Sequence, residues 1–218
     1  MADPSKIIEN EIEYSIGNFT GFEMIYDFDK ILIYLDVKGK SLFGVDFKIH
    51  KGDEEVILKL CNYIVKDVKS CQKHDIDTEK NILLSGPVGC GKTSIFKLIQ
   101  CIVPRQRAIE IIPCRNIVFG FNHLGYKIIE DYENGGNICF DDLGIEPYGS
   151  HYGRDCNVMG EILISRYELF LKSSFKTHAT TNLDSKELEE RYGNRVISRM
   201  REMFNLVSFN SETLDKRK

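Results

Sequence analysis

Residues 86–93 read Gly86-Pro87-Val88-Gly89-Cys90-Gly91-Lys92-Thr93, which is the complete pattern G-x-x-x-x-G-K-T of a phosphate-binding loop. The apolar residues 81–85 before it suit a buried strand, and residues 94–99 after it suit an amphipathic helix. In that context the glycines let backbone N–H groups wrap the phosphates, and the helix N-terminus adds a favourable dipole. The motif therefore predicts a nucleotide bound by the loop and by Ser94, which follows it.

Two side chains of this loop carry the expected chemistry. Lys92 is expected to reach the β- and γ-phosphate oxygens, and the Thr93 hydroxyl is expected to ligate Mg²⁺. We therefore expect ATP and Mg²⁺ as the ligands of this chain.

The composition is that of an ordinary soluble protein. The chain has 218 residues, of which 42% are hydrophobic and 28% are charged, so we expect one domain or one domain with a small appendage. The net charge is −4, and no global basic field draws the chain to nucleic acid. Contact with DNA or RNA would need a local patch or the assembly of several subunits.

The cysteines and the first residues favour a cytoplasmic protein. Seven cysteines are scattered without a C-x-x-C pair, which favours reduced thiols over a disulfide framework or a zinc ribbon. Residues 1–5 have neither the basic start nor the apolar run of a secretory signal. No apolar stretch approaches the ~20 residues of a membrane span, so no membrane contact is expected.

Hydrophobic periodicity divides the chain near residue 50. A weak helix is expected over residues 6–14. Two strands with period-two alternation are expected over residues 31–37 and 43–49, which predict a hairpin or a pair of neighbouring strands. We therefore expect residues 1–50 to be an extension with a β-hairpin, and residues 51–218 to be the nucleotide-binding domain.

Beyond residue 50 strands and helices alternate. A helical stripe starts at residues 52–53 and runs toward residue 69. After the phosphate loop, strands are expected at residues 108–113, 137–140, 175–180 and 206–209. Helices are expected at residues 116–132, 158–172 and 185–204, the last with a break at Gly193-Asn194. This alternation predicts an α/β fold with a mostly parallel sheet and the nucleotide at the carboxyl edge of the strands.

An acidic pair follows one of these strands. Asp141 is expected to hold Mg²⁺ directly or through water, and Asp142 stands where a general base would orient the attacking water. Because Asp142 is one methylene shorter than the glutamate usual at such a position, hydrolysis could be slow, and Glu146 is a candidate substitute. The alternative is a solvated acidic turn.

Polar side chains also end the next strand. In Thr180-Thr181-Asn182 an amide or hydroxyl could hydrogen-bond both the lytic water and the γ-phosphate, although such a sequence is also a common turn.

Arginines recur at a spacing of four in the last expected helix, at Arg191, Arg195 and Arg199. Spacing alone favours surface arginines that pair with nearby glutamates. The alternative is an arginine finger that reaches the γ-phosphate bound by a neighbouring subunit.

The motifs together resemble a known family. The loop, the segment Cys139–Glu146, the segment Thr180–Leu183 and the segment Glu190–Met200 follow the order found in AAA+ ATPases of the DnaC/IstB type. These are bacterial or phage helicase loaders and transposition helper ATPases. The resemblance covers roughly residues 80–209. It implies an AAA+ P-loop NTPase fold, with a parallel sheet flanked by helices, over residues 51–218.

The resemblance also implies roles for single residues. Asp141 and Asp142 would form the hydrolysis motif, Asn182 the first sensor, and Arg199, within Ser-Arg-Met, the arginine finger, with Arg195 as the second choice. A second sensor is expected near the C-terminus, where only Lys216-Arg217-Lys218 is available and Arg217 is the candidate. The C-terminal lid of the family would then be minimal or absent.

Three classes of function remain open. The resemblance favours an ATPase that self-assembles with ATP and acts on a replicative helicase or a transposase, with single-stranded DNA as a further ligand. A small-molecule kinase uses the same loop, but the acidic pair followed by Thr180-Thr181-Asn182 fits hydrolysis better. An adaptor gated by nucleotide binding without turnover is the third class, since Asp142 departs from the usual glutamate.

Overall fold

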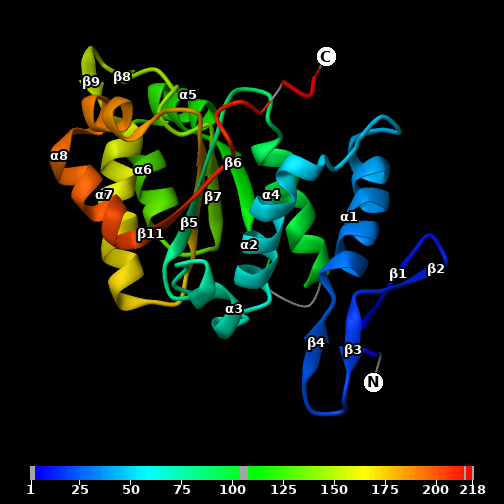
Figure 1. Cartoon of the computed structure of the whole chain (residues 1–218). Coiled ribbons are helices and arrows are strands. Elements are labelled where there is room, and N and C mark those ends of the chain that lie inside the picture. The colour runs from blue at the N-terminus through cyan, green and yellow to red at the C-terminus, as the bar shows by residue number, and fades with distance from the viewer. Residues whose placement is uncertain (1–2, 104–107, 214, 218) are drawn as a thin grey trace. The chain divides into compact units, whose positions relative to one another are not determined.

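The computed structural model describes residues 3–103, 108–213 and 215–217 (Figure 1). The chain divides into two compact units. One contains residues 1–74 and 94–106, and the other contains residues 75–93 and 107–218. The expected boundary at residue 50 stays a prediction, and each unit is described below by itself.

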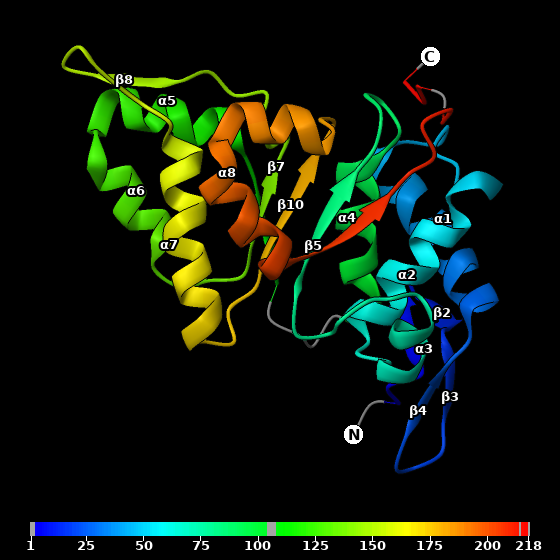
Figure 2. The ribbon, with the colours of Figure 1, turned by 60° about the vertical axis from the view of Figure 1, so that its left-hand side comes forward.

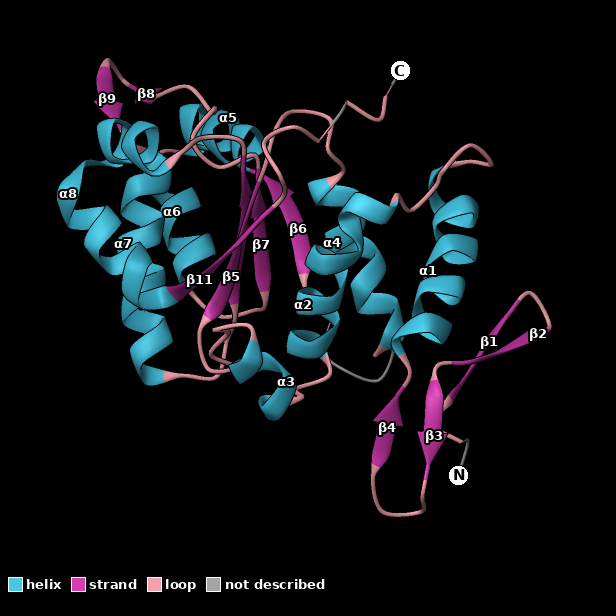
Figure 3. Ribbon diagram, viewed as in Figure 1, coloured by secondary structure: helices cyan, strands magenta, loops and turns pink. Residues whose placement is uncertain are grey.

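The second unit is built on a five-stranded sheet, in which the strand order is β11-β5-β10-β7-β6 and all pairs are parallel (Figure 3). The strands are β5 (Asn81–Ser85), β6 (Glu110–Pro113), β7 (Ile138–Asp141), β10 (Thr177–Thr181) and β11 (Phe204–Ser208). All five were expected from the sequence. Because the strands are parallel, their carboxyl ends meet at one edge of the sheet.

Four helices pack together beside this sheet (Figure 2). They are α5 (Cys114–Leu124), α6 (Tyr126–Glu133), α7 (Val158–Lys172) and α8 (Ser185–Met203). The helix expected over residues 116–132 is two helices, because Gly125 between them has φ 63°, a left-handed value that ends α5. The five-stranded parallel sheet flanked by helices confirms the predicted α/β class.

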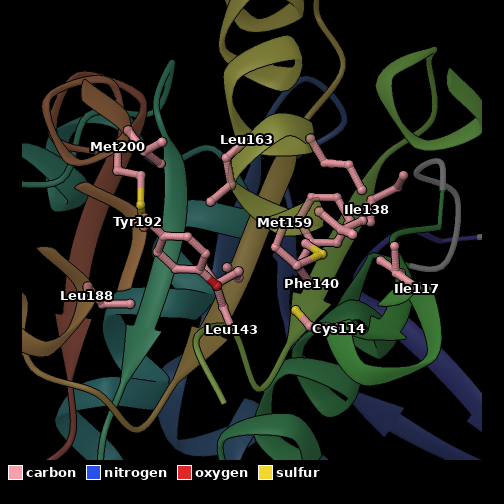
Figure 4. Close-up of a cluster of buried hydrophobic side chains, with 14 of the residues drawn as sticks. Cys114, Ile117, Ile138, Phe140, Leu143, Met159, Leu163, Leu188, Tyr192 and Met200 are labelled. Atoms are coloured by element: carbon pink, nitrogen blue, oxygen red, sulfur yellow. The ribbon is translucent and has the colours of Figure 1, made fainter. Parts of the chain in front are cut away.

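The core of this unit lies between the sheet and these helices. Figure 4 shows side chains from β7, α5, α7 and α8 converging there, and Phe140, Cys114 and Met159 are fully buried. From α8, the buried residues Leu188, Tyr192, Val196 and Met200 join this core. The apolar spacing of four in the sequence therefore marks the face of α8 that is removed from water.

The expected break in α8 is confirmed. Gly193 has φ 79° and ψ 160°, so the helix is interrupted between Tyr192 and Asn194. At its start, Asp184 accepts hydrogen bonds from the N–H groups of Lys186 and Glu187, while the Glu187 side chain accepts from the Asp184 N–H. This capping box fixes where the helix begins, directly after β10.

A short hairpin between β7 and α7 was not expected. Strands β8 (Gly149–His151) and β9 (Arg154–Cys156) pair antiparallel across the two-residue turn Tyr152-Gly153. Tyr152 and Gly153 have φ values of 49° and 75°, which is the geometry of a type I′ turn. Asn-Gly or Asp-Gly is the usual sequence signal for that turn, and because this turn has Tyr-Gly, the sequence did not predict it.

The first unit begins with two hairpins. They are formed by β1 (Lys6–Glu9) with β2 (Ile12–Ser15) and by β3 (Gly17–Phe19) with β4 (Met24–Tyr26). The helix expected over residues 6–14 is therefore wrong. Asn10 and Glu11 take left-handed φ values of 49° and 66°, which closes a two-residue turn where the expected helix would have continued.

The hairpin expected over residues 31–49 is also wrong, because residues 28–43 form the helix α1 (Phe28–Phe43). Asp27 caps its start by accepting the Lys30 N–H. The buried residues are Ile31, Tyr34 and Leu35, at helical spacing, whereas Ile33 is 63% exposed. The alternation of Ile31, Ile33 and Leu35 thus coincides by chance with a strand pattern. The strands among residues 1–50 lie in residues 6–26 instead, where they form two hairpins that the sequence did not predict.

The rest of this unit is helical. It contains α2 (Glu54–Ile64), which was expected, and α3 (Val68–Lys73). Helix α4 (Lys92–Ile99) starts in the second unit, and its residues from Ser94 on belong to the first. Short 3₁₀ turns stand at Lys51–Asp53 and Gln100–Ile102. Within the described ranges, no helix has the length and apolar character needed to cross a membrane.

Candidate nucleotide-binding site

The phosphate-binding loop lies between β5 and α4, as the motif requires. Gly89 and Gly91 have φ values of 79° and 97°, a region that side-chain-bearing residues rarely adopt. These two left-handed residues turn the chain sharply at the N-terminus of α4, where backbone N–H groups and the helix dipole favour an anion. The loop therefore has the backbone geometry of a phosphate cradle.

Lys92 bends back over this loop. Its side chain is buried, and Nζ donates to the carbonyl oxygens of Gly86 at 2.8 Å and Pro87 at 3.0 Å. A phosphate in the cradle would offer this ammonium charged oxygens, which form stronger hydrogen bonds than neutral carbonyls.

Asp141 joins the loop to the neighbouring strands. Its Oδ1 accepts the hydroxyl hydrogens of Thr93 at 2.8 Å and Thr180 at 2.7 Å. The sequence analysis expects both Thr93 and Asp141 at the Mg²⁺ site, but it does not predict the contact of Asp141 with Thr180. The available signal is the register: Ala179 pairs with Phe140, so the next residues along the two strands are neighbours.

Asp142 follows in an unusual backbone conformation. Its φ is 57°, and its N–H donates to Thr180 Oγ1 at 3.0 Å. Although the side chain stays accessible, surrounding protein atoms and the Asp141 charge raise the pKa of Asp142, while Lys92 and Arg217 oppose the rise. A raised pKa makes this carboxylate a better proton acceptor than an ordinary aspartate.

Asn182 stands at the carboxyl end of β10. Its side-chain oxygen Oδ1 is buried and has no hydrogen-bond partner among the described residues. The preceding residue is fixed, because Thr181 Oγ1 donates to the Leu143 carbonyl at 2.7 Å. Since buried polar atoms are nearly always paired, this oxygen is suited to a ligand or water that completes the site.

Glu146 is held in a network of its own. Its carboxylate accepts the Gly144 N–H at 2.8 Å and the Tyr192 hydroxyl at 2.7 Å, and it forms an ion pair with Arg191 at 3.4 Å. Arg191 also lies 4.1 Å from the centre of the Tyr148 ring. These contacts give Glu146 and Arg191 a role in positioning the loop after β7, and we do not assign Glu146 the role of base.

The other two arginines lie beyond the break in α8. Arg195 is exposed, and Arg199 is half-buried, with its guanidinium 5.3 Å from the centre of the Tyr167 ring. Gly193 interrupts the helix, so that Arg191 stands before the break, whereas Arg195 and Arg199 follow it. Arg191 forms an ion pair with Glu146, which lies outside this helix, and Arg201 forms one with Glu189. Spacing alone favoured ion pairs between the arginines and nearby glutamates, and Arg191 pairs instead with the loop after β7.

The residues present fit Mg²⁺. Thr93 Oγ1 and Asp141 Oδ1 are oxygen atoms of the kind that ligate Mg²⁺, and they lie 2.8 Å apart beside the loop. At phosphate sites Mg²⁺ uses one or two such protein ligands together with phosphate oxygens and water. A cage of three or more His, Cys, Asp or Glu side chains does not occur in the part of the chain that is described. The site is therefore suited to a metal that arrives with phosphate.

Comparison with known proteins supports the fold. No protein-family model matches the chain, and comparison with curated protein sequences finds no match. Among solved structures, the DnaC helicase loader is similar with a TM-score of 0.54 and 20% identity, over 75% of this chain and 93% of that one. A Streptococcus pyogenes serotype M3 protein, assigned provisionally as a primosome component, is similar with a TM-score of 0.55 and 15% identity, over 81% and 90%. The fold of this chain is therefore similar to that of the DnaC helicase loader, and the predicted parallel sheet flanked by helices is confirmed.

Proposed function

We propose that this chain is an ATPase that self-assembles with ATP and loads a replicative helicase in DNA replication. The observation that carries the proposal is the position of Asp141, whose Oδ1 accepts hydrogen bonds from Thr93 of the phosphate loop and Thr180 of the adjacent strand. This contact brings together three of the four motifs on which the resemblance to helicase loaders rests. The similar fold of the DnaC helicase loader supports the same assignment.

In this proposal the chain's residues divide the work of hydrolysing ATP to ADP and phosphate. The loop N–H groups and Lys92 bind the β- and γ-phosphates, while Thr93 and Asp141 hold the metal. Mg²⁺ bound there would neutralise charge on the phosphate oxygens. Asp142 accepts a proton from the attacking water, and Asn182 Oδ1, which has no partner among the described residues, orients that water.

Arg199 is assigned to a neighbouring subunit's nucleotide. A guanidinium that reaches the γ-phosphate from another copy stabilises the charge that develops in the transition state. Such a residue would make turnover depend on assembly, so the same proposal covers the ATP-dependent homo-oligomer. Arg195, which is exposed on the same half of α8, is the second choice.

A first experiment tests nucleotide binding and turnover. We expect Lys92→Ala to abolish ATP hydrolysis and to weaken nucleotide binding strongly, because it removes the ammonium from the phosphate loop. Lys97→Ala is the matched control, since Lys97 is exposed on the same helix. Phosphate release and fluorescent-nucleotide binding are measured for both. Normal turnover in Lys92→Ala would contradict the proposed site.

A second experiment tests the partner. Asp142→Asn is expected to bind ATP without hydrolysing it, and the trapped protein should retain a replicative helicase and single-stranded DNA in pull-downs with ATP but not with ADP. Light scattering with a non-hydrolysed ATP analogue is expected to show an oligomer. A strict monomer at every concentration would contradict the assembly.

Other functions give different outcomes. Recovery of a transposase in place of a helicase would indicate a transposition helper of the IstB type. Full biological function of Asp142→Asn would favour a nucleotide-gated adaptor. Phosphate release only in the presence of an acceptor molecule would favour a small-molecule kinase.

A further inference from the structure

The chain after β11 returns to the phosphate-binding loop. The Phe209 N–H donates to the Ser85 carbonyl at 2.8 Å, which continues the pairing of β11 with β5 to the start of the loop. A Cβ atom built on Gly86 would approach Phe209 Cβ to 2.8 Å, so the first glycine of the loop packs directly against this residue. The end of the sheet and the end of the described chain thus lie against the same loop.

Lys216 contacts this loop at two successive peptides. Its backbone N–H donates to the Gly89 carbonyl at 3.1 Å, and its Nζ donates to the Cys90 carbonyl at 2.6 Å. The ammonium also lies 5.4 Å from the centre of the Phe209 ring. The preceding residue fits closely as well, because a Cβ atom on Gly89 would collide with the Asp215 carboxylate.

These two contacts constrain where the loop N–H groups point. In a trans peptide the C=O and N–H bonds point in opposite directions, and no cis peptide occurs among the described residues. The Gly89 carbonyl shares its peptide with the Cys90 N–H, and the Cys90 carbonyl shares its peptide with the Gly91 N–H. Carbonyls directed toward Lys216 therefore direct both N–H groups toward the inside of the loop. The Cys90 N–H indeed points at the Pro87 carbonyl across the loop, at 3.3 Å.

We propose that Lys216 is a positioning residue for the nucleotide phosphates, which holds the carbonyls of Gly89 and Cys90 so that the loop N–H groups face the cradle. This inference rests on the proposed nucleotide binding and extends it to a segment that the loop motif does not include. Lys216 acts through the backbone of the loop, so its effect is the same for any nucleotide whose β-phosphate occupies the cradle. A loop held in its binding conformation before the ligand arrives loses less entropy on binding.

The test compares Lys216→Met with Lys216→Arg. Methionine keeps the backbone N–H and an unbranched side chain that is one atom shorter, but it removes the charged donor, whereas arginine restores a donor. Lys186→Met is the control, because it removes an exposed lysine at the start of α8. We expect Lys216→Met to weaken ATP and ADP binding equally, by about tenfold, which is the scale of one charge-assisted hydrogen bond. Lys216→Arg should bind nearly as the unaltered chain does.

A second measurement does not depend on nucleotide. Hydrogen exchange of the amides in residues 89–91, followed without ligand, should be faster in Lys216→Met than in Lys186→Met, while the two melting temperatures agree. Unchanged exchange would overturn the inference even if the chain binds no nucleotide at all. Failure of the proposed function would instead appear as absent nucleotide binding in the unaltered chain together with the faster exchange.

Two other binding results for Lys216→Met would contradict a positioning role. A loss confined to ATP, with ADP binding unchanged, would mean that Lys216 contacts the γ-phosphate and does not position the loop. Tighter binding by Lys216→Met would mean that the segment obstructs the site. Either result would overturn the proposal.

Discussion

His178 is a single buried residue that makes the stability of the folded chain depend on pH. It lies within β10, it is 1% exposed, and its Nδ1 accepts the Ile82 N–H of β5 at 3.1 Å. That hydrogen bond requires Nδ1 to be unprotonated. Burial, together with the positive charges of Lys176 and Arg166, lowers the pKa of His178 from 6.5 to about 3.

We predict that the chain loses stability as the pH falls below 6.5. Below that value the unfolded chain binds a proton on His178 that the folded protein takes up only near pH 3. Stability is therefore full above about pH 6.5, and this residue removes at most about 1.4 kcal/mol per pH unit below it. Urea denaturation at pH 7.5 and pH 5 measures the difference. It should shrink in His178→Asn but persist in His123→Asn, which alters an exposed histidine.

At the scale of residues, the sequence predicts what a local motif encodes. Lys92, Thr93 and Asp141 were proposed as site residues because the loop and the acidic pair are contiguous patterns with a known geometry. The contact of Thr180 with Asp141 was missed because it depends on the register between β7 and β10, which no local pattern contains. The sequence also does not predict the hydrogen bond that Tyr192 donates to Glu146, because Tyr192 belongs to a helix far along the chain.

At the scale of elements, Arg166 anchors α7 to the start of two strands. It is fully buried, and it donates to the carbonyl oxygens of Gly135, Gly136 and Lys176 and to the Thr177 hydroxyl. Burial lowers the pKa of Arg166 to about 10, so the guanidinium still carries its charge at neutral pH. One side chain thus donates hydrogen bonds both to the loop before β7 and to the start of β10.

We predict that Arg166→Met destabilises the chain by about 3 kcal/mol or more. The methionine fills much of the space but leaves several buried carbonyls unpaired, at about 1–3 kcal/mol for each unsatisfied group. Urea denaturation measures the loss, with Lys172→Met as a control near the exposed end of the same helix. A loss below about 1 kcal/mol would mean that water replaces the guanidinium.

The elements of the nucleotide-binding unit were predicted better than those of the first unit. Strands such as β5 and β7 are buried and contain continuous apolar runs, Ile82–Leu84 and Ile138–Phe140, which the sequence shows directly. In α1 a short run of alternating apolar residues matched a strand, although only its residues at helical spacing are buried. Over such a short run, period two and period 3.6 cannot be separated by sequence alone.

At the scale of the whole molecule, the proposed arginine finger makes activity a property of the assembly. Arg199→Ala should leave nucleotide binding intact and lower turnover by about 10³-fold, the scale reported for arginine fingers. Lys92→Ala is expected to be inactive for a different reason, because its own phosphate loop lacks the ammonium group.

We predict that a mixture of these two variants regains part of the lost turnover. In a mixed oligomer, the intact loop of an Arg199→Ala subunit can face the intact Arg199 of a Lys92→Ala subunit. Phosphate release is measured at a fixed total concentration while the ratio of the two variants is changed, and a maximum is expected at an intermediate ratio. A flat profile would show that Arg199 acts within its own subunit or not at all.

The strand order also has a consequence for biosynthesis. The strand that leads into the phosphate loop, β5, lies between β10 and β11, and β11 is formed by residues 204–208. While the chain emerges from the ribosome, β5 keeps an open edge until almost all of the described residues have been translated. Strand pairing across this distance in sequence is slow, and unpaired edges favour aggregation. If the phosphate loop binds nucleotide as proposed, a nucleotide that binds only the completed sheet would favour molecules in which β11 has paired with β5.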